Sequence, residues 1–234
     1  MGDMGTTRPF RQPPEPNQPI VAFDFDGTLT VRDSFTAFLK WKVGPESWRT
    51  GLLAMAPQLA AYALERDRQK LKEAAVRRFL PNMGPSTLGV EAEQFARERW
   101  DVLMRPDALD VWAGWGRRGA YRVIVTASPA VTVQPFADRL GADALLGTDL
   151  VTDAKGWFTG AFEGPNCRGE EKVRRLQAAF GQDVRLAAAY GDTSGDTEML
   201  AIADIAGFRV FKERPVTRAS AARARRRSAD RTTS

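Results

Sequence analysis

The chain has 234 residues, and its 43% hydrophobic content predicts a globular protein with a buried core. It contains no histidine, which excludes the phosphatase, nuclease and hydrolase mechanisms that depend on a histidine. The net charge is +5, and the single Cys167 cannot form an internal disulfide, which suits a reducing cytoplasm.

The first segment, residues 1–19, is rich in proline, glycine, glutamine and arginine and has no apolar region. This composition predicts a flexible arm rather than a secretory signal. The sequence has no run of roughly 18 apolar residues, the length that a membrane-spanning helix needs. We therefore expect a cytoplasmic protein.

Two aspartates, Asp24 and Asp26, follow the apolar run IVAF at 20–23. Carboxylates at the end of a buried strand must be paired or bind a metal, because an isolated buried charge is costly. Gly27 allows a tight turn and close approach of a ligand, and Thr28 offers a hydroxyl and an amide to an anion. The alternative is that the aspartates only end the strand and start a turn.

Residues 35–104 are predicted to be helical. Pro57 should kink a helix or start a new one. The apolar residues between 52 and 64 could meet a lipid surface, but we favour packing among these helices. Apolar residues recur there at helical spacing, among them Trp48, Leu52, Met55, Leu59 and Tyr62.

A second strand is predicted at 123–125, with Thr126 at its carboxyl end, where ligands bind in open α/β sheets. Ser128 before Pro129 fits a helix N-cap at least as well as a catalytic role, so Thr126 is the preferred functional hydroxyl. Helices are predicted on either side of this strand, at 106–118 and 131–140, followed by a hairpin within 146–162.

A candidate cation, Lys172, lies at the start of an amphipathic helix. Its ammonium could reach back toward the sheet while the apolar face of the helix packs. Arg168 is a rival for the same role.

A third strand is predicted at 186–190, followed by Asp192 and, about one helical turn later, Asp196. Mg²⁺ prefers oxygen ligands and is commonly bound by one or two carboxylates. Asp24 and Asp192 would meet that need, whereas Glu198 is predicted to be a surface residue.

Together, four strings resemble the ordered motifs of the haloacid dehalogenase superfamily, over roughly residues 20–211: FDFDGTLT, VTAS, GEEK and GDTSGDTEML. The resemblance implies an α/β fold, with a Rossmann-like three-layer parallel sheet and a helical cap. It implies a phosphatase with an aspartyl-phosphate intermediate, in which Asp24 is the nucleophile and Asp26 the general acid and base. It also implies Mg²⁺ bound by Asp24, Asp192 and the carbonyl oxygen of Asp26.

The same resemblance implies that Thr126 and Lys172 neutralise the phosphoryl oxygens. It also implies that Asp196 orients the lysine or the metal-bound waters. Phosphate-binding positions would be Gly27, Thr28 and Ala127. The predicted organisation is an arm (1–19), a catalytic core (20–34 and 105–211), a helical cap (35–104) and a basic tail (212–234).

The helical cap resembles that of subclass IB, which includes the phosphoserine phosphatases. Asp33 matches the position at which those enzymes place a glutamate toward the substrate amino group, so Asp33 and Arg168 are candidate specificity residues. The pattern DSFxxFL is more similar to the branch that includes phosphatidylglycerophosphate phosphatases. We predict a small phosphorylated metabolite or a phospholipid head group as substrate.

The tail concentrates arginine between residues 218 and 227 and could attract an anionic membrane surface. It lacks interleaved aromatic residues, which disfavours a nucleic-acid site. Phosphotransfer to another acceptor and a non-catalytic binding protein remain alternatives, although the second would be expected to lose Asp24, Asp26 or Asp192.

Overall fold

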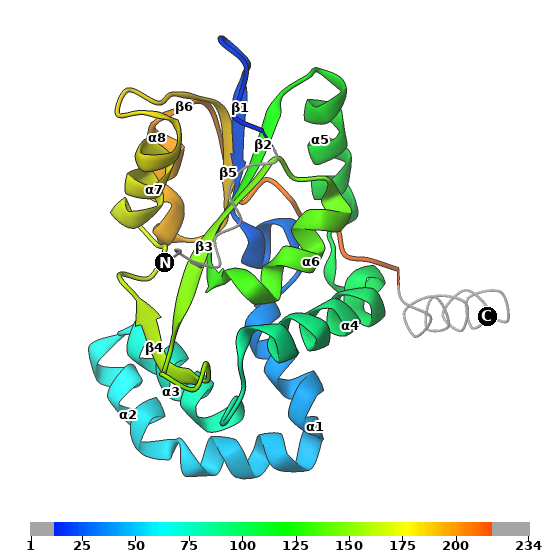
Figure 1. The fold of residues 1–234 in the computed structure, drawn as a ribbon. Coiled ribbons are helices and arrows are strands. Elements are labelled where there is room, and N and C mark those ends of the chain that lie inside the picture. The colour runs from blue at the N-terminus through cyan, green and yellow to red at the C-terminus, as the bar shows by residue number, and fades with distance from the viewer. Residues whose placement is uncertain (1–11, 217–234) are drawn as a thin grey trace, which may run out of the picture.

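The computed structural model describes residues 12–216 and centres on one six-stranded sheet with the strand order β4-β3-β2-β1-β5-β6 (Figure 1). Neighbouring strands are parallel except β3 and β4. The predicted α/β fold with a Rossmann-like sheet is therefore confirmed. The strands are β1 (Ile20–Phe23), β2 (Tyr121–Pro129), β3 (Ala144–Thr152), β4 (Phe158–Glu163), β5 (Leu186–Gly191) and β6 (Ala203–Phe208).

Helices cover both faces of the sheet, because successive side chains of a strand point to opposite sides. Phe23 packs edge-on against Trp112 in one apolar cluster. Its neighbour Ala22 belongs to the other cluster, together with Leu176. The covering helices are α5 (Pro106–Arg117) and α6 (Ala130–Leu140) on one face, and α7 (Glu170–Phe180) and α8 (Thr197–Ala201) on the other.

Four further helices lie between β1 and β2 and form the lower part of the molecule in Figure 1. As predicted, Pro57 lies in the first turn of a new helix, where its missing N–H costs nothing. An additional break occurs at Gly44, where a φ of 74° precedes Pro45 and interrupts α1. The helices are α1 (Ser34–Ala54), α2 (Ala56–Glu65), α3 (Arg68–Phe79) and α4 (Pro85–Leu103).

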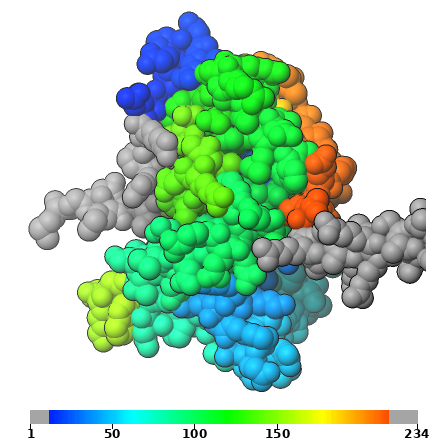
Figure 2. All heavy atoms as spheres, turned by 90° about the vertical axis from the view of Figure 1, so that its right-hand side faces the viewer, coloured from blue at the N-terminus to red at the C-terminus, as the bar shows by residue number. Residues whose placement is uncertain are grey.

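The helical segment also contacts the sheet region away from its two chain connections. Lys72 of α3 donates a hydrogen bond to the carbonyl of Ala127 at 2.9 Å, and Glu73 accepts one from the amide of Phe162 in β4 at 3.2 Å. In Figure 2 the β3–β4 hairpin reaches down beside the helical segment. These contacts hold α3 over the carboxyl end of β2.

At the ends of the described chain, Gln18 donates a hydrogen bond to the carbonyl of Gly119 at 2.8 Å. The arginine-rich stretch 218–227 lies outside the described residues. Across residues 12–216, no helix is both long enough and apolar enough to cross a bilayer.

Candidate active site

The site forms where the central strands end together. Phe23 at the end of β1 is in register with Ile124 of β2 and with Tyr190 of β5. The residues that follow these positions therefore meet at one edge of the sheet. The register brings Asp24, the end of β2 and Asp192 to a common site, on the side that faces the helical segment (Figure 1).

A buried ammonium group joins two of the predicted carboxylates. Lys172 is 1% exposed, and its Nζ donates to Asp24 Oδ1 at 2.6 Å, to Asp196 Oδ1 at 2.7 Å and to the carbonyl of Val125 at 2.7 Å. Burial alone would lower the pKa of Lys172, but the two carboxylates outweigh it and raise that pKa. The lysine is therefore a fixed positive charge between Asp24 and Asp196.

The surroundings of Asp24 strongly shift the pKa of its carboxyl group. Its Oδ2 accepts a hydrogen bond from the Thr28 hydroxyl at 3.2 Å. Burial outweighs the attraction of Lys172 and raises the pKa of Asp24 to about 7. Without a further cation, this carboxyl group takes up a proton near neutral pH.

Asp192 has the features of a metal ligand. Its Oδ1 is buried without a hydrogen-bond partner among residues 12–216. Carboxylate oxygens of Asp24, Asp192 and Asp196 all lie within 4.8 Å of one another. Gly27, with a φ of 86°, leaves room for Asp192, because a Cβ there would lie 2.2 Å from Asp192 Oδ2. Hard oxygen donors and an unsatisfied buried oxygen fit Mg²⁺.

Both carboxylate oxygens of Asp196 accept hydrogen bonds from other groups of the protein. Its Oδ1 accepts from Lys172, and its Oδ2 accepts from the amides of Asp192 and Thr193 at 3.1 and 2.9 Å. Burial opposes its ionisation, but Lys172 and these hydrogen bonds lower the pKa of Asp196. Its contacts suit positioning of the lysine and of the Asp192 loop.

Asp26 is held by two groups that the sequence analysis did not assign to it. The amide of Ser34 donates to Oδ1 at 2.6 Å and the hydroxyl of Ser128 donates to Oδ2 at 2.5 Å. Burial raises the pKa of Asp26, and the nearby carboxylate of Asp33 raises it further. The N-cap interpretation of Ser128 was wrong, because α6 is capped at Pro129 and the Ser128 hydroxyl is directed to Asp26 instead.

Of the predicted phosphate-binding groups, some form hydrogen bonds within the protein and one lines the cavity. Thr126 is fully buried, and its hydroxyl oxygen accepts from the amide of Ser128 at 3.1 Å. The Gly27 amide donates to the Thr30 hydroxyl at 3.3 Å. Ala127 lines the cavity described next. Phosphate contact by Thr126, Gly27, Thr28 and Ala127 stays a prediction.

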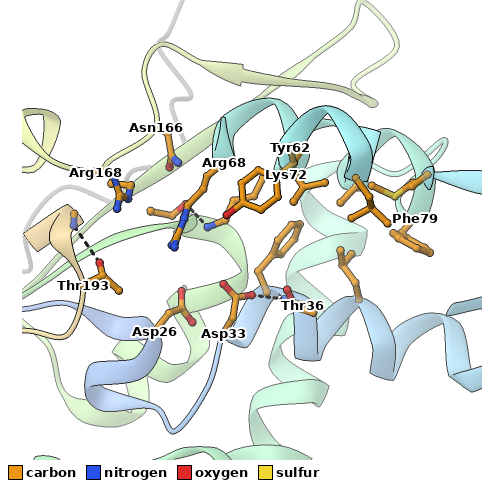
Figure 3. A pocket seen from close by; sticks show the side chains of 18 of the residues that line it. Asp26, Asp33, Thr36, Tyr62, Arg68, Lys72, Phe79, Asn166, Arg168 and Thr193 are labelled. Carbon is orange, nitrogen blue, oxygen red and sulfur yellow. Dashed lines mark hydrogen bonds between the residues drawn. The ribbon is translucent and has the colours of Figure 1, made fainter. Parts of the chain in front are cut away.

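A cavity of about 340 Å³ opens from Asp24 and Asp26 into the helical segment. In Figure 3, Asp26 and Asp33 lie on one side of it and Lys72 and Arg68 on the other. Asp33 also caps α1 by accepting from the amide of Thr36 at 2.7 Å.

Both candidate specificity residues, Asp33 and Arg168, line this cavity. The guanidinium of Arg168 donates to the Ser194 hydroxyl at 3.0 Å, so Lys172 is the cation of the pair that contacts Asp24. Lys72 was missed by the sequence analysis, because nothing in its helix distinguishes it from other surface lysines.

These arrangements can be compared with known proteins. The sequence model of the haloacid dehalogenase-like hydrolases matches residues 21–201, a span that contains every carboxylate described above. The chain belongs to this family. The predicted family membership and the prediction of an enzyme are thus confirmed.

This haloacid dehalogenase-like hydrolase is also similar to several individual proteins. It is 56% identical over 196 residues to protein CicA of Caulobacter vibrioides, covering 84% of this chain and 88% of CicA. It is 31% identical over 187 residues to a phosphoserine phosphatase of Halobacterium salinarum, covering 77% and 81%. A crystal structure of a Bordetella pertussis Tohama I protein of unknown function is 26% identical, with a TM-score of 0.62 over 80% of this chain and 87% of that one.

Proposed function

We propose that this hydrolase is a Mg²⁺-dependent phosphomonoesterase that acts through an aspartyl-phosphate intermediate. The observation that carries the proposal is the group formed by Asp24, Lys172 and Asp192. One carboxylate is paired with a buried ammonium, and beside it an unsatisfied carboxylate oxygen is placed for a cation. The phosphoserine phosphatase relative supports the reaction type.

In the first half-reaction, a carboxylate oxygen of Asp24 attacks phosphorus and the bond from phosphorus to the ester oxygen breaks. Asp26, whose raised pKa favours its protonated form, gives its proton to the leaving alkoxide. Lys172 offsets the negative charge of the phosphoryl group. Asp24 and Asp192, with the carbonyl of Asp26, would hold Mg²⁺, which when bound neutralises phosphoryl oxygens.

In the second half-reaction, Asp26 takes a proton from water, and the resulting hydroxide attacks the phosphorus of the aspartyl phosphate. The bond to Asp24 breaks, which releases inorganic phosphate and restores the carboxylate. The hydrogen bonds from Ser34 and Ser128 fix the Asp26 carboxyl group for both proton transfers.

We further propose that residues 35–104 act as a cap that excludes water from the phosphoryl site. The hydrogen bond from Lys72 to Ala127 brings the cap over that site. Transfer of the phosphoryl group to another acceptor would use the same first half-reaction and differs only in what replaces water.

The direct test is phosphate release from phosphoserine, phosphoethanolamine, sugar phosphates, nucleotides and phosphatidylglycerophosphate, with Mg²⁺ or with EDTA. We expect release only with Mg²⁺, with a loss of at least about 100-fold in EDTA, because the carboxylates alone repel a phosphate dianion. A folded protein that releases no phosphate from any ester in Mg²⁺ would refute the proposal.

We expect Mg²⁺ to bind more tightly as pH rises through 7. The pKa of Asp24 is about 7 in the folded protein against an ordinary value of 3.8, so the folded state holds a proton between these values that the unfolded state lacks. In the absence of metal, the contribution of Asp24 to the free energy of unfolding therefore falls as pH rises through that window. Mg²⁺ must displace the proton, so its affinity falls by up to about tenfold per pH unit below 7.

The measurement is the increase in Tm on addition of Mg²⁺, taken at intervals between about pH 5.5 and pH 8. Asp192→Asn is the control and should abolish the increase at every pH. An increase of equal size across the whole range would contradict the assignment of Asp24 as a ligand.

A further inference from the structure

Beyond the phosphoryl site, the cavity continues between the cap helices, and there its wall is apolar. The side chains that form this part, called the apolar chamber below, come from the second half of α1, from α2 and its preceding residue, and from α3. They include Trp48, Leu52, Met55, Leu59, Leu71 and Phe79.

Close packing of specific side chains forms the wall of the chamber. Trp48 and Phe79 stack with ring centroids 4.9 Å apart, and Phe79 is 5% exposed. Gly51 makes room for this pair, because a Cβ at that position would lie 2.2 Å from the Phe79 ring. Two cap helices are thereby fixed side by side with their apolar side chains directed at the cavity (Figure 3).

The face of α2 that lines the chamber has no protein partner that buries it. Along α2, which the structure describes throughout, no residue is buried. Leu59 lines the chamber and is 37% exposed, whereas Leu64 on the same helix is 87% exposed and lies outside the chamber. The preference for packing within the cap, predicted for residues 52–64, was therefore wrong for Leu59, which faces the cavity that leads to Asp24, and for the exposed Leu64.

Charge is concentrated at the other end of the cavity. Asp33, Lys72 and Arg168 lie near the phosphoryl site with Asp26, as Figure 3 shows. A ligand that matches both ends carries a phosphate at one end and hydrocarbon at the other. A small polar alcohol such as serine would leave the apolar walls in contact with water.

We propose that the substrate is a phosphomonoester whose alcohol carries an aliphatic chain, and that this chain occupies the apolar chamber. The proposal rests on the phosphatase function above and names its substrate class. Transfer of each methylene from water into the chamber should then raise kcat/KM by roughly fourfold, until the chamber is filled.

The test compares kcat/KM for methyl, butyl, hexyl and octyl phosphate, each kept as a monomer in solution, with phosphoserine. We expect an increase with chain length of at least about 100-fold overall, with phosphoserine near methyl phosphate. Leu59→Asn should reduce the hexyl and octyl values about tenfold or more relative to the value for methyl phosphate. The matched control, Leu64→Asn, should alter none of them.

Rates that do not depend on chain length, or a preference for phosphoserine, would overturn the chamber proposal and leave the phosphatase intact. Absence of release from every ester would instead remove the phosphatase function. In that case, the chamber proposal is tested separately by equilibrium binding of octyl phosphate, with tryptophan fluorescence as the readout. Tighter binding than methyl phosphate, lost in Leu59→Asn, would support it, and equal binding would refute it.

Discussion

Substitution of asparagine for Asp24 is expected to lower kcat for phosphate release by at least about 10⁴-fold. The amide is a poor nucleophile and cannot form the acyl phosphate on which both half-reactions depend. It also removes the charge that faces Lys172 at 2.6 Å and one proposed ligand of Mg²⁺. The measurement is steady-state phosphate release, together with the intact mass of acid-quenched protein, which should show a phosphorylated species only in the parent.

Asp110→Asn is the matched control, because Asp110 lies exposed on α5, away from the cavity. It should retain full activity and the same Tm as the parent. If folded Asp24→Asn protein kept activity within tenfold of the parent, Asp24 would not be the nucleophile and a water-mediated mechanism would replace the proposed one.

Replacement of Lys172 by methionine is expected to destabilise the fold by about 3–5 kcal/mol, because it leaves the buried carboxylates of Asp24 and Asp196 without their cation. It should also reduce kcat by about 10³-fold, since the phosphoryl group loses a fixed positive charge. Urea unfolding gives the stability, and phosphate release with a saturating ester gives the rate.

The stability loss should be smaller at acid pH, where the two unpaired carboxyl groups can take up protons. Arg168→Met is the control, because Arg168 makes its hydrogen bond to Ser194 at the cavity edge rather than to a buried charge. It should cost less than about 1 kcal/mol. Equal losses in the two variants would show that Lys172 is not the central cation.

Much of the core could be predicted from local patterns. The apolar runs that become β1 and β2 end at hydrophilic residues, and parallel strands place their carboxyl ends on one edge. The order of the motifs therefore indicated that Asp24 and Lys172 would meet, although 148 residues separate them. β6 was not predicted, because its segment ADIAGF is short and contains a glycine.

The remaining parts of the site depend on contacts that no local pattern specifies. Ser128 and Asp26 are 102 residues apart, and the short-range preference of serine before proline for a helix N-cap concealed their hydrogen bond. Helical periodicity identified the apolar face of α2, but periodicity cannot distinguish a face that packs on protein from one that lines a cavity. Lys72 likewise became visible only when α3 was placed over β2.

The six named side chains of the apolar chamber all come from one continuous stretch, residues 48–79, whereas Asp24, Asp26, Lys172 and Asp192 lie outside it. On the proposed assignment, the six side chains of the chamber and the groups that cleave the phosphate are therefore encoded in separate parts of the gene. Mutations confined to that stretch can diversify the accepted alcohol among descendants while the bond-breaking apparatus is inherited unchanged.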